Sequence, residues 1–249
     1  MCMKIIAFTG AGISKQSNIP TFMEAPEVRE KLFRSFAETH HEEYNAVIRQ
    51  LKANMNGAEP NDAHFALAEY KIPVITMNID GLHRKARTDA LELHGGLPED
   101  DEMDIAWSLY NKPVLYGDPA PNYQKAYEMV YELERGDVLL VIGCSYHTAI
   151  ACDLRDVAKS RGAHVVEIQS DAAHNVRKTL EALLKSQNQP KSKGESIRCA
   201  FAFHVMCAVY VQAFAYRKDR STQRTAFPAG FPPEHPWDNE QREKYGKTQ

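Results

Sequence analysis

Four short segments of this chain carry residue types that can bind a nucleotide and do chemistry beside it. They are Gly10 to Ser14, Met77 to Gly81, Leu93 to Gly95 and Val141 to Ser145. Glycine-rich turns let backbone N–H groups come close to a pyrophosphate. His94, in the third segment, titrates near neutral pH and can accept a proton. Together the segments predict a nucleotide site with its own base.

The polar side chains of these segments suit particular parts of a nucleotide. Asn78 and Asp80 supply an amide and a carboxylate suited to a carboxamide such as nicotinamide. The hydroxyl of Ser145 can hydrogen-bond a ribose or phosphate oxygen. Each segment also has a simpler interpretation: a tightly packed glycine turn, a structural histidine, or an ordinary Asn-Asp-Gly turn.

The hydrophobic pattern places the segments at the ends of strands. Apolar runs predict the strands, spacing of about 3.6 residues predicts a helical stretch from Ala25 to Lys71, and two further helices follow the later strands. The predicted strands are Lys4–Phe8, Ile72–Thr76, Val138–Ile142 and Val165–Ile168, and the later helices are Ala149–Ser160 and Ala172–Lys185. This alternation predicts a doubly wound parallel α/β sheet with its ligand crevice at the carboxyl ends of the strands. Gln169, directly after the last predicted strand, joins the expected cofactor-binding residues.

Composition narrows the functional classes. The chain has 249 residues, 43% of them hydrophobic and 25% charged, with a formal net charge of −3. It is long enough to bury one large domain, and its charge gives no long-range attraction for nucleic acid. The N-terminus lacks a leader pattern, and the cysteines are few and scattered, as in reduced proteins: Cys2, Cys144, Cys152, Cys199 and Cys207. We therefore expect a cytoplasmic protein.

Six ordered motifs resemble the sirtuins, the NAD-dependent protein deacylases. They are Gly10 to Ser14, Asn18 to Met23, Thr76 to His83, Leu93 to Gly95, Tyr116 to Asp118 and Gly143 to Ser145. The resemblance covers roughly residues 1–186. It implies a Rossmann-like, sirtuin-type NAD-binding domain with a reduced helical small domain inserted at about residues 24–70.

The resemblance also implies a role for each motif. His94 is the base that deprotonates a ribose hydroxyl, and Asn78 joins it as a catalytic residue that, with Asp80, holds the nicotinamide portion. Phe22 shields the reaction centre, and the backbone at Tyr116 and Gly117 pairs with an acyl-lysine peptide. The remaining cofactor-binding residues hold the phosphates and ribose: Gly10, Ala11, Gly12, Ser14, Gly143 and Ser145.

Two departures from the sirtuin pattern change these expectations. No cysteine lies between Cys2 and Cys144, so the family's zinc module of two Cys-x-x-Cys pairs cannot be built after His94. We expect a short variant without zinc. Met23 and Met77 replace an arginine and a glutamine, which removes two hydrogen-bonding side chains near the ribose.

The last quarter of the chain has no counterpart in the motifs. Residues 187–249 read as a polar linker, an apolar helix over Cys199 to Tyr216 and a disordered tail. His204 and Gln212 interrupt the apolar stretch and argue against a membrane span.

The leading hypothesis from sequence is an NAD-dependent deacylase that moves an acyl group from a protein lysine to ADP-ribose and releases nicotinamide. The first alternative is NAD hydrolysis or ADP-ribosyl transfer, favoured by the missing module because an open site admits water. The second, suggested by Met23 and Met77, is a module that binds NAD or ADP-ribose without turnover. The expected partners are NAD and an acylated lysine.

Overall fold

The protein is built on a single sheet of parallel strands. The computed structural model describes residues 3–19, 26–146 and 148–187. Five strands lie in the order β3-β2-β1-β4-β5, and every pairing is parallel. Their bounds are β1 Ile5–Thr9, β2 Val74–Thr76, β3 Ala90–Glu92, β4 Val138–Ile142 and β5 His164–Ile168. The doubly wound α/β fold expected from the sequence is confirmed.

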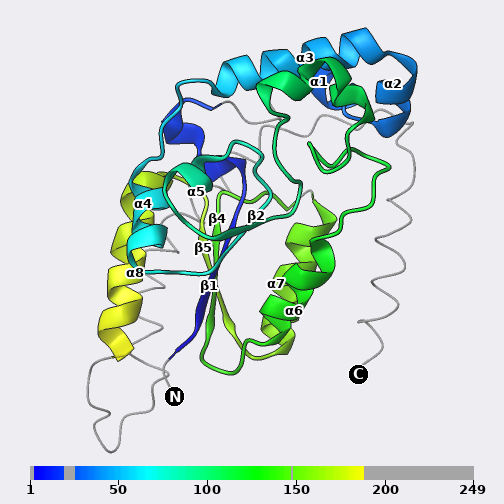
Figure 1. Ribbon diagram of the computed structural model, residues 1–249. Helices are drawn as coiled ribbons and strands as arrows, with labels where there is room; N and C mark the ends of the chain where they lie inside the picture. The colour runs from blue at the N-terminus through cyan, green and yellow to red at the C-terminus, as the bar shows by residue number, and fades with distance from the viewer. Residues whose placement is uncertain (1–2, 20–25, 147, 188–249) are drawn as a thin grey trace, which may run out of the picture.

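The central strands are apolar throughout because both faces of the sheet are covered. All five residues of β1 and all five of β4 are buried. Helices α4 (Asp62–Glu69) and α8 (Ala172–Gln187) lie on one face, and α6 (Tyr123–Tyr131) and α7 (Ala149–Ser160) on the other (Figure 1). Alternate strand residues therefore enter two separate cores. Ala7 and Leu140 face α4 and α8, whereas Phe8 and Val141 face α6 and α7.

A helical unit lies beside the carboxyl ends of the strands (Figure 1). It contains α1 (Pro26–Glu30), α2 (Arg34–Thr39), α3 (His41–Met55) and the 3-10 helix η4 (Asp100–Ser108). These elements share a third core, formed by Ala37, Tyr44, Ile48, Leu51, Met103, Ala106 and Leu115. We call this unit the small domain.

The helical stretch predicted over residues 25–71 is confirmed and consists of four helices, α1, α2, α3 and α4. Other predicted elements need correction. The glycine turn after β1 leads into two single-turn 3-10 helices, Ala11–Ile13 and Lys15–Ser17, rather than an α-helix. A phosphate there would meet few aligned backbone dipoles, so the expected helix contribution is small. Strand β3 and helix α6 were not predicted.

In the part of the chain that the structure describes, no helix is both long and apolar enough to cross a membrane. The predicted linker, apolar helix and tail lie outside the described residues, apart from Gln187, which ends α8.

Candidate active site

His94 is held at both ring nitrogens. It follows β3, and its Nδ1 lies 3.0 Å from the carbonyl oxygen of Met77 while its Nε2 lies 3.0 Å from the hydroxyl of Tyr123. A carbonyl oxygen only accepts, so Nδ1 carries the proton and Nε2 keeps its lone pair. Burial lowers the pKa of His94, although its bond to the Met77 backbone opposes that shift. The ring is therefore neutral near pH 7, as a general base must be.

The substitution at Met77 does not affect this support. The carbonyl oxygen that holds His94 belongs to the backbone, so any residue at this position offers it. The Met77 side chain packs instead against the core under α6 and α7.

Ser14, Asn78 and Asp80 form one hydrogen-bonded cluster where β1 and β2 end. The Ser14 hydroxyl donates to Asp80 Oδ2 at 2.6 Å, and Asn78 Nδ2 donates to both Ser14 Oγ and Asp80 Oδ2 at 3.1 Å. The backbone N–H of Leu82 donates to the other carboxylate oxygen. The structure thus places three predicted residues in contact, but the Ser14 hydroxyl is already hydrogen-bonded to Asp80 and Asn78.

The two glycine loops pack directly on each other. Gly12 N–H donates to the carbonyl oxygen of Gly143 at 3.0 Å. A Cβ on Gly12 would lie 2.6 Å from Gly143 Cα, and Gly143 has a left-handed φ of +61°. Tight packing, the simpler interpretation of these glycines, therefore holds for Gly12 and Gly143. The same contact brings the ends of β1 and β4 together.

A buried ion pair supports the loop after β4. Arg155 is almost fully buried, and its guanidinium bonds the Glu167 carboxylate and the carbonyl oxygen of Cys144. Tyr146 and Gln169 also donate to Glu167. Burial alone would raise the pKa of Glu167, but these donors outweigh it and the pKa is lowered. Gln169 thus stands at the end of β5 in contact with a carboxylate, and Ser145 is exposed beside this network.

Tyr116 does not present a free backbone edge. Its N–H donates to Leu32 O at 3.0 Å and its carbonyl accepts from Arg34 N at 2.9 Å, which forms a parallel bridge with Phe33. Gly117 follows with a left-handed φ of +102°. The expected pairing of a peptide strand with the Tyr116 backbone is therefore not available unless this bridge opens, because a backbone N–H has one proton to donate.

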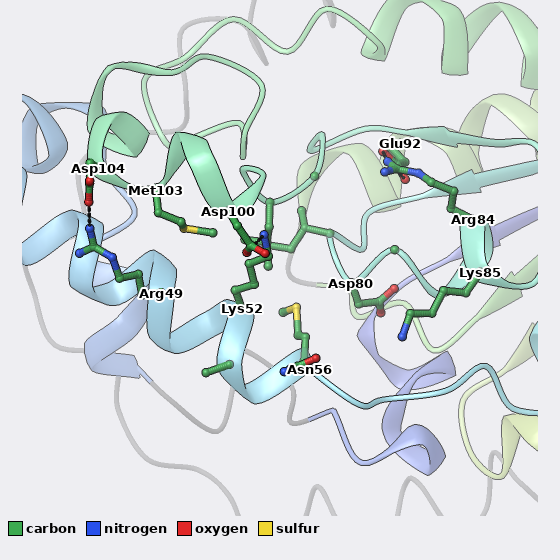
Figure 2. A pocket seen from close by; sticks show the side chains of 16 residues that line it. Arg49, Lys52, Asn56, Asp80, Arg84, Lys85, Glu92, Asp100, Met103 and Asp104 are labelled. Atoms are coloured by element: carbon green, nitrogen blue, oxygen red, sulfur yellow. Dashed lines mark hydrogen bonds and ion pairs between the residues drawn. The ribbon is translucent and has the colours of Figure 1, made fainter.

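A pocket of about 650 Å³ separates the small domain from the sheet. Figure 2 shows Arg49 and Lys52 of α3 on one side and Arg84 and Lys85 on the other, with Asp80 between them. Each of these cations has an acidic partner: Asp104, Asp100, Glu92 and Glu59 respectively. Asp80 is the predicted site residue that reaches this pocket, and His94 does not line it.

Two of the residues discussed from sequence, Phe22 and Met23, lie outside the described residues.

Three residues of the observed site were not predicted from the sequence: Tyr123, Arg155 and Glu167. Tyr123 is 29 positions from His94 and begins helix α6, whereas His94 lies in the turn after β3, so no spacing pattern connects them. The apolar strand that contains Glu167 could be recognised in the sequence. A single carboxylate near the end of such a strand indicates a buried cationic partner.

Comparisons with known proteins find relatives by sequence and by fold. No family model matches the chain. A relative named NAD-dependent protein deacylase from Thermococcus sibiricus is 33% identical over 207 residues, which are 67% of this chain and 80% of the relative. NAD-dependent protein deacylase 2 of Archaeoglobus fulgidus is 31% identical over 210 residues, 67% of this chain and 79% of the relative.

Solved structures show the same fold. A Sir2 homologue in complex with NAD aligns with a TM-score of 0.61 at 21% identity, over 75% of this chain and 91% of that one. Sir2Tm bound to a propionylated peptide aligns with a TM-score of 0.60 at 24% identity, over 73% and 93%.

The fold is that of Rossmann-like α/β proteins. The chain belongs to the sirtuin family, the NAD-dependent protein deacylases.

Proposed function

We propose that this chain is an NAD-dependent protein-lysine deacylase in which His94 is the general base. The observation that carries the proposal is the state of His94: a neutral ring whose Nδ1 is fixed by Met77 and whose Nε2 keeps its lone pair. Its relatives are named protein deacylases at 31 to 33% identity.

The polar side chains near His94 could bind NAD. The amide of Asn78 and the carboxylate of Asp80 match the hydrogen-bonding groups of a carboxamide, and they lie at the end of β2, beside the strand that leads to His94. Ser145 and Gln169, which lie at the ends of β4 and β5, would bind the adenosine part of NAD. NAD would supply the ribose carbon that the acyl oxygen attacks as nicotinamide leaves, and the ribose hydroxyl that takes up the acyl group. The chain's own task is to hold the carboxamide and to remove a proton at Nε2 of His94.

The short variant without a zinc module is part of this proposal. Helix η4 occupies the segment after His94 and packs on α3 through Met103 and Ala106. Within the described residues, no group of three or more His, Cys, Asp or Glu side chains is arranged to hold a metal ion. We expect a chelator to leave thermal unfolding unchanged, and one equivalent of tightly bound zinc in the purified protein would contradict this part. The cytoplasmic setting also stays a prediction.

NAD hydrolysis or ADP-ribosyl transfer is the second candidate. It is favoured by the bridge between Tyr116 and Phe33, in which the Tyr116 N–H already donates to Leu32, so a peptide strand would have to displace that bond to accept from it. In this case water or another acceptor replaces the acyl oxygen.

One experiment separates the candidates. The full chain is incubated with NAD, with and without an acetyl-lysine peptide, and nicotinamide and deacylated peptide are quantified by mass spectrometry. If the chain is a deacylase, nicotinamide and deacylated peptide should both form only when peptide is present. His94→Ala should abolish both products. The control His174→Ala, which changes an exposed histidine of α8, should keep them. Nicotinamide release without peptide selects hydrolysis. NAD binding without any product would leave a non-catalytic module and overturn the proposal.

A further inference from the structure

The hydroxyl of Tyr123 occupies the proton-accepting atom of His94. The two rings are 6.1 Å apart between centroids and tilted by 46°, so the contact runs through the hydroxyl, 3.0 Å from Nε2, rather than through stacking. Because Nδ1 donates to Met77, the Tyr123 O–H must be the donor to Nε2.

A neutral imidazole has one lone pair, and it lies in the ring plane at Nε2. While Tyr123 donates to that lone pair, a sugar hydroxyl cannot also donate to it. The sugar must either displace the phenol or pass its proton through the phenol oxygen, because a phenol hydroxyl can both donate and accept a hydrogen bond.

The surroundings of Tyr123 argue against displacement. Tyr123 is the first residue of α6, and the side chain of Asn122, directly before it, donates to the carbonyl oxygen of Glu92 at 2.7 Å. Glu92 ends β3, the strand that leads to His94. The Tyr123 ring packs against the core under α6 and α7, which also contains Leu93. Both partners of the pair are therefore anchored to the same strand and the same core.

We propose that Tyr123 and His94 act as a dyad in which the phenol hydroxyl, rather than the bare imidazole, receives the proton of the sugar hydroxyl. This inference rests on the proposed function. The sugar O–H bond breaks and its proton goes to the phenol oxygen, while the phenol proton goes to Nε2. The sugar oxygen keeps the electron pair, Tyr123 ends as a neutral phenol, and His94 ends as an imidazolium.

The dyad has a matched control on its own helix. Tyr127 lies one turn further along α6, its ring enters the same core, and its hydroxyl donates to Asp153 at 2.9 Å. Tyr127→Phe removes a bonded hydroxyl from α6, as Tyr123→Phe does, without touching His94.

The pair itself is tested without substrate by ¹⁵N NMR of the full chain. In the wild type, the Nε2 resonance of His94 should be that of an unprotonated nitrogen that accepts a hydrogen bond. It should move toward a free unprotonated nitrogen in Tyr123→Phe and stay unchanged in Tyr127→Phe, with Nδ1 protonated in all three. An Nε2 resonance that does not respond to Tyr123→Phe overturns the dyad.

The catalytic role is tested by steady-state kinetics with NAD and acetyl-lysine peptide. Tyr123→Phe should lower kcat for deacylated peptide by about 10- to 100-fold, because the relay is lost but the imidazole base remains; the upper value is the lower end of what positioned proton transfer typically contributes. The KM for NAD should change less than about twofold. Tyr127→Phe should match the wild type. A Tyr123→Phe variant with the same kcat as the wild type overturns the relay. A variant with a higher kcat also overturns it, because the phenol would then block the access of the sugar hydroxyl to Nε2. If the wild-type protein releases no nicotinamide, the proposed function is contradicted instead. The NMR experiment then still shows whether Tyr123 and His94 form a hydrogen-bonded pair.

Discussion

Arg34 grips the carboxylate of Asp118 with two hydrogen bonds, from Nε to Oδ1 and from Nη2 to Oδ2, each 2.7 Å long. Both side chains are buried. The same guanidinium donates to the carbonyl oxygens of Trp107 and Leu109. One residue of α2 thus ties the turn after Tyr116 to the end of η4.

Removing the cation of this pair should be costly. Arg34→Met leaves the Asp118 charge buried without its partner, and we expect the free energy of unfolding to fall by about 3 to 5 kcal/mol. Arg34→Lys should recover only part, because an ammonium cannot make the two-pronged contact. Urea denaturation measures both. The double variant Arg34→Met/Asp118→Leu should be more stable than Arg34→Met, and the opposite order would contradict a penalty from the unpaired carboxylate.

The contact between the two glycine loops predicts an intolerance to any side chain. Gly143→Ala places a Cβ 2.4 Å from Gly12 Cα and forces a left-handed φ. We expect a loss of about 1 to 3 kcal/mol in stability together with weaker NAD binding, measured by calorimetry. Gly96→Ala is the control, because its nearest neighbour is a side-chain atom 3.8 Å away. Equal NAD affinity in the two variants would show that the loop contact is irrelevant to the nucleotide.

Two buried histidines should make the fold sensitive to acid. His64 and His83 lie with their ring centroids 4.9 Å apart, and burial lowers their pKa values to about 4 and about 3. The unfolded chain binds protons at these residues from about pH 6.5 downward, whereas the folded chain does not, so stability is full above that pH and falls as the pH falls.

For His64 alone the loss approaches about 3 kcal/mol at pH 4. Urea denaturation of the wild type, His64→Gln and His174→Gln at pH 7.5 and pH 5, about one unit above and about 1.5 units below the free histidine pKa, provides the test. His64→Gln should reduce the difference between the two pH values, and the exposed His174→Gln should preserve it. A pH dependence that survives His64→Gln unchanged would remove His64 from the explanation.

The Glu167 network predicts an effect on the cofactor. Glu167→Gln keeps the side chain's shape but removes the charge that faces Arg155, and we expect stability to fall by about 1.5 to 3 kcal/mol, the contribution of a charged hydrogen bond. Tyr146 and Gln169 donate to different oxygens of the carboxylate, and glutamine keeps only one of these acceptors, so one of the two contacts is lost and NAD affinity should fall as well. Glu181→Gln, which breaks an exposed pair with Lys185 on α8, should change neither quantity.

Much of the sheet could be predicted from sequence, since burial on both faces leaves a continuous apolar run. The predicted bounds of Val138–Ile142 and Ala149–Ser160 are those observed. Strand β3 was missed because it has three half-exposed residues and a single large apolar side chain, Leu91.

The candidate site could be predicted from sequence where a motif specifies the residue type, as for His94, Asn78 and Asp80, whose roles stay predictions. It was not predictable where tertiary structure supplies the partner. Tyr123 reaches His94 from the next helix, and the Tyr116 backbone is paired by a segment more than 80 positions earlier. Hydrogen bonds of this kind leave no spacing in the sequence.

The separate core of the small domain has a consequence for dynamics. That core shares no residue with the two cores that cover the sheet. Such a division lets one part of a protein open while the rest stays folded. Amide hydrogens of α3 should therefore exchange through a lower-energy opening than those of β1 and β4. The pocket between the two units would widen in that opening without any unfolding of the strands.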